Sequence, residues 1–301
     1  MSFFIDAFEP AFMQRALIGG LIAVIATSLV GTWIVLRGLA FLGDALAHGV
    51  IPGIALAILW GFDPAIGAFV AALIMSGLVT FVSNRTTVRD DTAIGLLFVG
   101  MLSLGVVIVS KSKSFSTDLT SLLFGDALGI SVGDIQKQLA FTVIVVVFTI
   151  FLYRPFLALT FNEVKAQTLG MHPRLAQAAL LGLLSLSIVS SFQTIGTLLV
   201  FGLLVAPPAT ASLVVKRVSG IMVVSVLFGT LAVFLGLLVS FYYGTAGGAT
   251  MAGFSVLQFF VVLTGRSILR RSRKLRTKET PEDEMASSAE QFCTHPSPLT
   301  N

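Results

Sequence analysis

The sequence contains little charge and almost no cysteine. Only 11% of its 301 residues are charged and 55% are hydrophobic, whereas roughly 25% of the residues of an ordinary soluble domain are charged. This shortage of charge, together with a mean hydropathy of +0.96, excludes an ordinary soluble domain and predicts a polytopic membrane protein. The single cysteine, Cys293, excludes an internal disulfide, so cysteine usage gives no indication of the redox compartment.

The sequence also lacks the common phosphate-binding and metal-binding motifs of enzymes. It contains no G-x-x-x-x-G-K-[ST] phosphate loop, no H-E-x-x-H metal motif and no cluster of cysteines. We therefore expect a chain that is not an enzyme and has no permanently bound cofactor; if ATP is spent, a separate subunit must hydrolyse it. The first ten residues, MSFFIDAFEP, have neither a basic n-region nor a small-residue cleavage site, so no removable signal peptide is expected.

Apolar runs of the length needed to cross a bilayer recur along the chain. A helix of about 20 residues spans the hydrocarbon core, and windows of that length predict nine spans. They lie at residues 11–36, 40–60, 64–82, 92–110, 136–153, 175–192, 195–214, 219–241 and 250–267. The predicted fold class is all-α and integral to the membrane, a polytopic bundle of about nine transmembrane helices. A transmembrane domain is expected over residues 1–268, followed over residues 269–301 by a basic and then polar tail, expected to be disordered.

Lys and Arg are distributed unevenly between the two sides of this predicted bundle. If the N terminus lies outside, fifteen of the nineteen fall on one side of the membrane. The four on the other side are Arg15, Lys111, Lys113 and Lys137. The positive-inside rule makes the richer side cytoplasmic, which predicts a multi-pass plasma-membrane protein with its N terminus outside and its C terminus in the cytoplasm. Seven of the basic residues follow the last span, between residues 266 and 278, and favour contact with membrane lipid over a nucleic-acid partner.

One outer link is long. Residues 114–134 are too polar to span the membrane but could contain a short re-entrant helix on the outer side.

Asp44 and His48 are ionisable residues inside a predicted span; every other Asp, Glu and His falls in a predicted link or tail. Counted from Arg37 at the cytoplasmic edge, a rise of about 1.5 Å per residue places them about 10 and 16 Å deep, near the midplane. Their i, i+4 spacing puts both side chains on one helix face. Ionisable residues at such depth most often mark a transport pathway, although a purely structural pair between helices is the alternative.

A carboxylate and an imidazole suit a divalent transition metal but are too few to hold one. A two-fold homodimer would double the set to two oxygens and two nitrogens, closer to what Mn²⁺, Zn²⁺ or Fe²⁺ requires. We therefore predict Asp44 and His48 as ligands of a transported metal ion, with a second copy of the chain completing the site. Which metal is carried cannot be told from these residue types, since all three ions accept them.

Two further stretches stand out. The link FNEVKAQTLGMHPRLAQAALLG, residues 161–182, predicts a short helix, a break at Gly170 and a second helix from near Pro173, where a first-turn proline is tolerated. It is either a docking element for a cytoplasmic partner or an amphipathic surface loop. Pro207 and Pro208 fall within a span and predict a bend there.

The motifs in this order resemble the permease subunits of bacterial ABC importers for zinc, manganese or iron. The resemblance is carried by LRGLAFLGDALAHGVIPGIALA (36–57), NEVKAQTLGMHPRL (162–175) and IGTLLVFGLLVAPPATASLV (195–214), and covers about residues 11–268. It implies a type II importer fold, a homodimer, a cytoplasmic ATP-binding subunit and an extracytoplasmic metal-binding protein. The second proline of APPATA and the long tail depart from the family pattern.

The resemblance also implies residue roles. Asp44 and His48 match the aspartate and histidine of the family's translocation pathway. The residues that match its ATPase-coupling helices are Glu163, Lys165, Gly170, Pro173 and Arg174.

Two other functions stay open at this point. One is a permease for a metal chelate or a cobalamin-like ligand, which needs a wider pathway and no metal ligands in it. The other is a proton-coupled secondary transporter, in which Asp44 and His48 relay protons. Secondary transporters often contain internal repeats, and the sequence shows none that is convincing.

Overall fold

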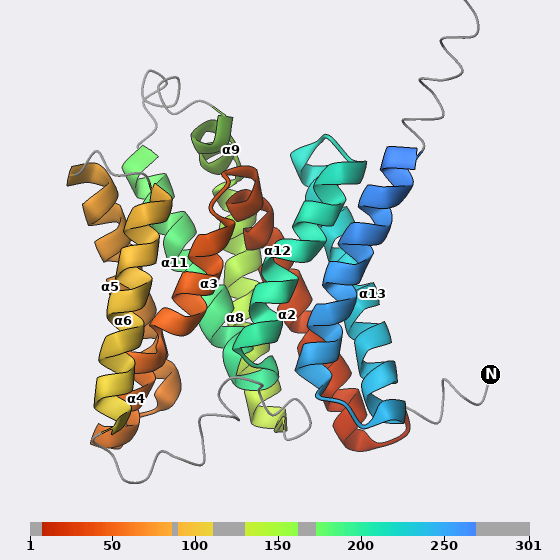
Figure 1. Cartoon of the computed structure of the whole chain (residues 1–301), viewed down its shortest axis with the longest axis horizontal. Helices are drawn as coiled ribbons and strands as arrows, with labels where there is room; N and C mark the ends of the chain where they lie inside the picture. The colour runs from red at the N-terminus through yellow and green to blue at the C-terminus, as the bar shows by residue number, and fades with distance from the viewer. Residues whose placement is uncertain (1–7, 86–89, 111–129, 162–172, 269–301) are drawn as a thin grey trace, which may run out of the picture. The chain divides into compact units, whose positions relative to one another are not determined.

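The computed structural model describes residues 8–85, 90–110, 130–161 and 173–268, and within these ranges the chain is helical apart from short turns, with no strand (Figure 1). The labelled helices are α2 (Ala11–Leu36), α3 (Ala40–Gly49), α4 (Ile51–Trp60), α5 (Pro64–Arg85), α6 (Asp90–Ser110), α8 (Val132–Phe151), α9 (Tyr153–Phe161), α11 (Pro173–Ile195), α12 (Thr197–Val214) and α13 (Val218–Tyr243). A final helix covers Gly247–Ile268. These residues separate into two compact units, one ending at Phe259 and the other beginning at Phe260, and the packing described below concerns the first.

Eight stretches within the described ranges are helical, long and apolar enough to cross a membrane. The apolar part of α12, Leu199–Val214, is shorter and adds a further helix of the same kind. The predicted all-α membrane bundle of about nine helices is therefore confirmed. The tail over residues 269–301 lies outside the described residues, as does most of the segment 114–134 for which a re-entrant helix is considered, so both stay predictions.

The predicted span 40–60 consists of two short helices in series. α3 ends at Gly49, and Pro52 lies in the first turn of α4. Proline has no backbone N–H and its ring crowds the carbonyl four residues earlier, here that of His48, so a single regular helix is interrupted at this point. Trp60, the last residue of α4, and Phe62, in the turn that follows, are 66% and 64% exposed. Aromatic side chains of this kind gather at membrane–water interfaces, which places the turn between α4 and α5 at the edge of the bilayer.

α2 lies at the centre of the first unit. It packs against α8, α11, α12 and α13 (Figure 1). Side chains such as Trp33 and Ile34 are fully buried. α12 approaches it closely at Gly31, where a methyl group would overlap the carbonyl oxygen of Leu204. That carbonyl has no helical N–H donor because the residue four positions later is Pro208. A side chain as small as that of glycine is what lets two membrane helices meet backbone to backbone.

α12 contains both prolines that the sequence singles out. Pro207 and Pro208 lie inside the helix, which continues from Thr197 to Val214 without interruption. The backbone is therefore not broken at these residues, and the bend expected there stays a prediction.

Polar side chains join helices within the bundle. The hydroxyls of Ser76 on α5 and Ser185 on α11 lie 3.1 Å apart and share a hydrogen bond. The amide nitrogen of Gln138 on α8 donates to the carbonyl oxygen of Gly19 on α2 at 3.1 Å. Contacts of this kind hold membrane helices together where lipid supplies no hydrophobic driving force.

α8 begins with a capping box. The Ser131 hydroxyl accepts from the backbone N–H of Asp134 at 3.2 Å, and the Asp134 carboxylate accepts from the Ser131 backbone N–H at 3.2 Å and from its hydroxyl at 2.6 Å. Residues 129–133 also spell G-x-S-x-G, a pattern of hydrolase nucleophiles, but that motif requires a strand-to-helix turn. Ser131 is engaged in starting a helix, and the described part of the chain has no strand before it.

Candidate metal pathway site

Asp44 and His48 lie one turn apart on α3, as their spacing predicts. The Nδ1 atom of His48 is 3.4 Å from Oδ1 of Asp44 and 3.2 Å from the backbone carbonyl oxygen of Asp44. The side chain of Asp44 is 28% exposed and that of His48 is 25% exposed. The pair is therefore partly covered by this chain and partly open on its surface, within a stretch apolar enough to span a membrane.

The rest of α3 explains why this face is open. Leu42, Ala45 and Leu46 are buried, and the helix packs against α5, α6, α11 and α12. These apolar side chains hold one side of α3 in the core, so Asp44 and His48 take the remaining side. The local sequence thus fixes the direction of both polar groups through the residues that surround them.

An aromatic side chain on a neighbouring helix contacts the imidazole. The ring of Phe98, on α6, meets that of His48 edge to face, with centroids 6.0 Å apart and an interplanar angle of 89°. Phe41, on α3, makes a similar contact with Phe98, with centroids 6.0 Å apart and an angle of 71°. Asp44 and Phe98 together restrict the orientation of the imidazole ring. Sequence reasoning missed Phe98, because a phenylalanine in an apolar span looks the same whether it faces lipid or a ligand.

The pair can offer a cation one oxygen and one nitrogen. With Nδ1 turned toward Asp44, the atoms left for an ion are Nε2 of His48 and Oδ2 of Asp44. Within the described ranges, no group of three or more His, Cys, Asp and Glu side chains comes together. Structural zinc sites take four ligands and other transition metals often more, so two side chains suit an ion in passage better than a resident one.

The residues expected to couple to an ATPase lie mostly outside the described ranges. Glu163, Lys165 and Gly170 are among residues 162–172, and the side chain of Arg174 also falls outside what the structure describes. Pro173 is the first residue of α11, which confirms the predicted helix start, and it is buried. The docking role of this link stays a prediction.

Comparison with known proteins identifies the family. The family model described as "ABC 3 transport family" matches residues 9–266. The chain belongs to this family. It is 36% identical over 263 residues to the "Manganese import system permease protein ScaB" of Streptococcus parasanguinis, covering 86% of this chain and 94% of that one. It is also 32% identical over 268 residues to the "Probable iron transport system membrane protein" of Haemophilus influenzae, covering 88% of this chain and 97% of that one.

A solved structure supports the same assignment. The structure titled "PsaBC from Streptococcus pneumoniae in complex with Fab" superposes with a TM-score of 0.78 at 32% sequence identity, covering 86% of this chain and 94% of that chain. This ABC 3 family member is therefore a multi-pass membrane permease of the metal-ion ABC transporter class, with the importer-like helical fold that its sequence resembles.

Proposed function

We propose that this ABC 3 family permease imports Mn²⁺ across the bacterial plasma membrane, with Asp44 and His48 as the ligands that the ion meets in the pathway. The observation that carries the proposal is their placement, a carboxylate and an imidazole 3.4 Å apart on a partly exposed face of a membrane-spanning stretch. Carboxylate suits hard ions such as Mn²⁺, and imidazole suits several transition metals. The identity to a manganese import permease supports manganese as the cargo.

The pathway is proposed to form between two copies of the chain. Asp44 and His48 supply two ligand atoms, and each side chain is about a quarter exposed on the single chain. A two-fold axis close to this face brings the same pair from the second copy, which gives two oxygens and two nitrogens around one ion. The open face of α3 is the reason to place the axis there.

Other partners complete the proposed importer. A cytoplasmic ATP-binding subunit supplies the energy and docks on the link that contains Glu163, Lys165 and Gly170, with Arg174 at the start of α11. An extracytoplasmic metal-binding protein delivers the ion. This arrangement agrees with the predicted topology, in which the N terminus lies outside and that link lies in the cytoplasm.

Iron is a second candidate cargo. The Haemophilus influenzae relative, at 32% identity, is named as a probable iron transport protein, and Fe²⁺ accepts the same oxygen and nitrogen donors as Mn²⁺. Zinc accepts imidazole and carboxylate as well, so competition between the three ions is the measurement that ranks them.

Uptake in a deletion strain tests the proposal. Cells that lack the chromosomal copy are complemented with the full chain, and uptake of radiolabelled Mn²⁺ is measured with Fe²⁺ or Zn²⁺ as competitor. We expect Mn²⁺ uptake that disappears when the ATP-binding subunit is also deleted. Uptake that persists without that subunit and follows the proton gradient would indicate a secondary transporter, and growth restored only by a metal chelate or cobalamin would indicate the wider pathway. Stronger competition by Fe²⁺ or Zn²⁺ than by unlabelled Mn²⁺ would reassign the metal.

A further inference from the structure

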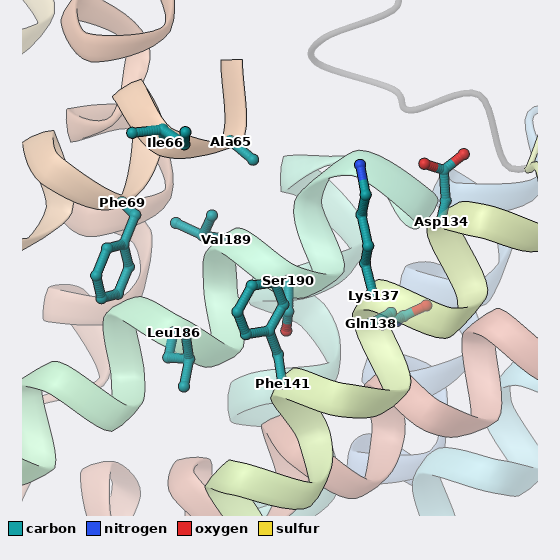
Figure 2. Close-up of a pocket in the computed structure, with 10 residues that line it drawn as sticks. All are labelled: Ala65, Ile66, Phe69, Asp134, Lys137, Gln138, Phe141, Leu186, Val189 and Ser190. Carbon is teal, nitrogen blue, oxygen red and sulfur yellow. The ribbon is translucent and has the colours of Figure 1, made fainter. Parts of the chain in front are cut away.

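A cavity of about 210 Å³ lies among α5, α8 and α11, and neither Asp44 nor His48 lines it (Figure 2). Its place in the fold is the end of the bundle where α5 begins at Pro64, α8 begins at Val132 and α11 ends at Ile195. The charge distribution of the sequence predicts that this end is extracytoplasmic.

The walls of the cavity are mainly apolar. Ile66 and Phe69 contribute from α5, Phe141 from α8, and Leu186 and Val189 from α11, with the two phenylalanine rings on opposite sides in Figure 2. Apolar cavities of about 150 Å³ stay dry and bind small hydrocarbons. This cavity is therefore large enough for several carbons of an acyl chain.

α8 gives the cavity a border with the bilayer. The helix packs against α2, α9 and α11, while two residues that line the cavity, Phe141 on α8 and Ile66 on α5, are 37% and 61% exposed. Exposed apolar side chains on spanning helices contact hydrocarbon, so acyl chains are the molecules present there at the highest concentration.

Lys137 lies at the edge of the same cavity and is the charged group available to a ligand. Figure 2 shows its side chain extending away from the apolar walls, and within the described ranges no hydrogen bond or ion pair engages its ammonium group. The carboxylate of Asp134, three residues earlier, is engaged with Ser131 in the capping box. At about 7.5 Å from the start of α8, Lys137 lies near the depth where headgroups meet hydrocarbon. A lysine there reaches toward anionic groups while its stem stays against apolar surface.

We propose that this cavity binds a membrane phospholipid. One acyl chain enters between Phe69, Phe141 and the wall formed by α11, and the lipid phosphate pairs with the ammonium of Lys137. Gln138, behind Lys137, ties α8 to α2 through Gly19, so the wall that carries the lysine is held in place without the lipid. The bound lipid then fills the space between three helices and stabilises their packing. Nothing in this proposal depends on which ion the permease carries.

Native mass spectrometry of the full chain, delipidated in mild detergent, tests the proposal. The probes are phosphatidylglycerol and a diacylglycerol with the same acyl chains, which lacks the phosphate. We expect one phosphatidylglycerol molecule to stay bound at low concentrations of added lipid. Diacylglycerol should bind at least about tenfold more weakly, because the charge-assisted contact with the phosphate is lost. Equal binding of the two lipids, or a cavity that takes up only water, would overturn the proposal.

Matched variants locate the lipid. Leu186→Trp fills the cavity and is expected to remove the retained lipid, whereas Leu139→Trp, at an exposed position of α8 outside the cavity, is expected to keep it. Lys137→Gln is expected to weaken phosphatidylglycerol to the level of diacylglycerol, and Lys137→Arg to restore it. Equal retention in both tryptophan variants, or in both Lys137 variants, contradicts the proposal. If Leu186→Trp does not fold, the Lys137 variants still test the proposal, because Lys137 is exposed and its substitution should not disturb folding.

Discussion

α3 and α8 both carry polar side chains into the membrane, and they turn them in opposite directions. Asp44 and His48 on α3 keep about a quarter of their side chains exposed. On α8, which packs against α2 and α11, Gln138, Thr142 and Thr149 are only 1%, 3% and 2% exposed, while apolar residues such as Val143, Val147 and Ile150 are exposed. The uncharged polar groups of α8 are buried between helices and contribute to packing. The ionisable groups of α3 are costly in a membrane and gain no packing contact that offsets this cost, so they indicate a ligand-binding role.

Changing the α3 pair should have the largest effect. Asp44→Asn keeps the shape but removes the charge that offsets a cation, and His48→Ala removes a nitrogen ligand; in a homodimer each change occurs twice. We expect uptake of radiolabelled Mn²⁺ to fall to background in both variants. The detergent melting temperature should not fall in either variant. Asp44→Asn removes a charge that costs at least about 2.5 kcal/mol in the membrane, and in His48→Ala the remaining Asp44 carboxylate is on a partly exposed face where it can reach water.

Asp63→Asn is the matched control for that experiment. Asp63 lies in the exposed turn before α5, where its carboxylate accepts from the backbone N–H of Ala65 at 2.8 Å, and asparagine can accept the same bond. Uptake near the wild-type level in both Asp44→Asn and His48→Ala would show that the two residues are not ligands in the translocation pathway. Destabilised single variants that are rescued in the double variant would instead show a structural ion pair.

Gln138→Leu tests the other half of the comparison. The change removes the hydrogen bond to the Gly19 carbonyl that joins α8 to α2. We expect the free energy of unfolding in detergent to fall by about 0.6 kcal/mol, the average for polar contacts between membrane helices, and by no more than about 1.7 kcal/mol, with metal uptake close to wild type. Gln136→Leu, at an exposed position on the same helix, should leave both readouts unchanged. Loss of uptake in a stable Gln138→Leu protein would mean that the α8 face also belongs to the pathway.

Phe98→Leu should have a smaller effect, on metal affinity. It removes the edge-to-face contact that restricts the His48 ring. Such contacts contribute about 0.5–1.5 kcal/mol, so the Mn²⁺ concentration for half-maximal uptake should rise by about two- to twelvefold. Val99→Ala, on the exposed side of α6, serves as the control. An unchanged concentration dependence would show that Asp44 alone orients the imidazole.

Thr142→Val and Thr149→Val should change least. Within the described ranges neither buried hydroxyl has a hydrogen-bond partner, and replacing an unpaired hydroxyl by a methyl group is nearly neutral or slightly stabilising. Melting temperatures should therefore stay close to wild type. A loss as large as that of Gln138→Leu would show that these hydroxyls are paired in the protein in its membrane.

Hydropathy was sufficient to predict most of the bundle, because each membrane helix must satisfy its own backbone and therefore appears as one apolar run. The run 11–36 coincides with α2. The run predicted to begin at 136 begins at Val132, since the capping box of Ser131 and Asp134 starts the helix on polar residues that hydropathy rejects. α9 was not predicted because it has only nine residues and follows directly after a span. A search for apolar runs of about 20 residues does not detect so short a helix.

The candidate site was only half predictable. Asp44 and His48 are four residues apart on one helix, so their contact follows from helical geometry. The contact of Phe98 with His48 depends on how α6 packs against α3, and Gln138 gains its role only from the carbonyl of Gly19, which is 119 residues away. Pairings of this kind are set by tertiary packing, which the spacing within one helix does not encode.

The depth of the α3 pair has an electrical consequence. In the predicted topology Arg37 and the exposed Trp60 lie at the two edges of the bilayer, and His48 lies about midway between them along the sequence. A divalent ion that reaches this pair from outside has crossed roughly half of the membrane potential. At about 2.3 kcal/mol per elementary charge per 100 mV, half the drop acting on two charges contributes about 2.3 kcal/mol per 100 mV. Under the proposed function, a cell that is negative inside holds its cargo at this point more tightly than a depolarised one, before any ATP is spent.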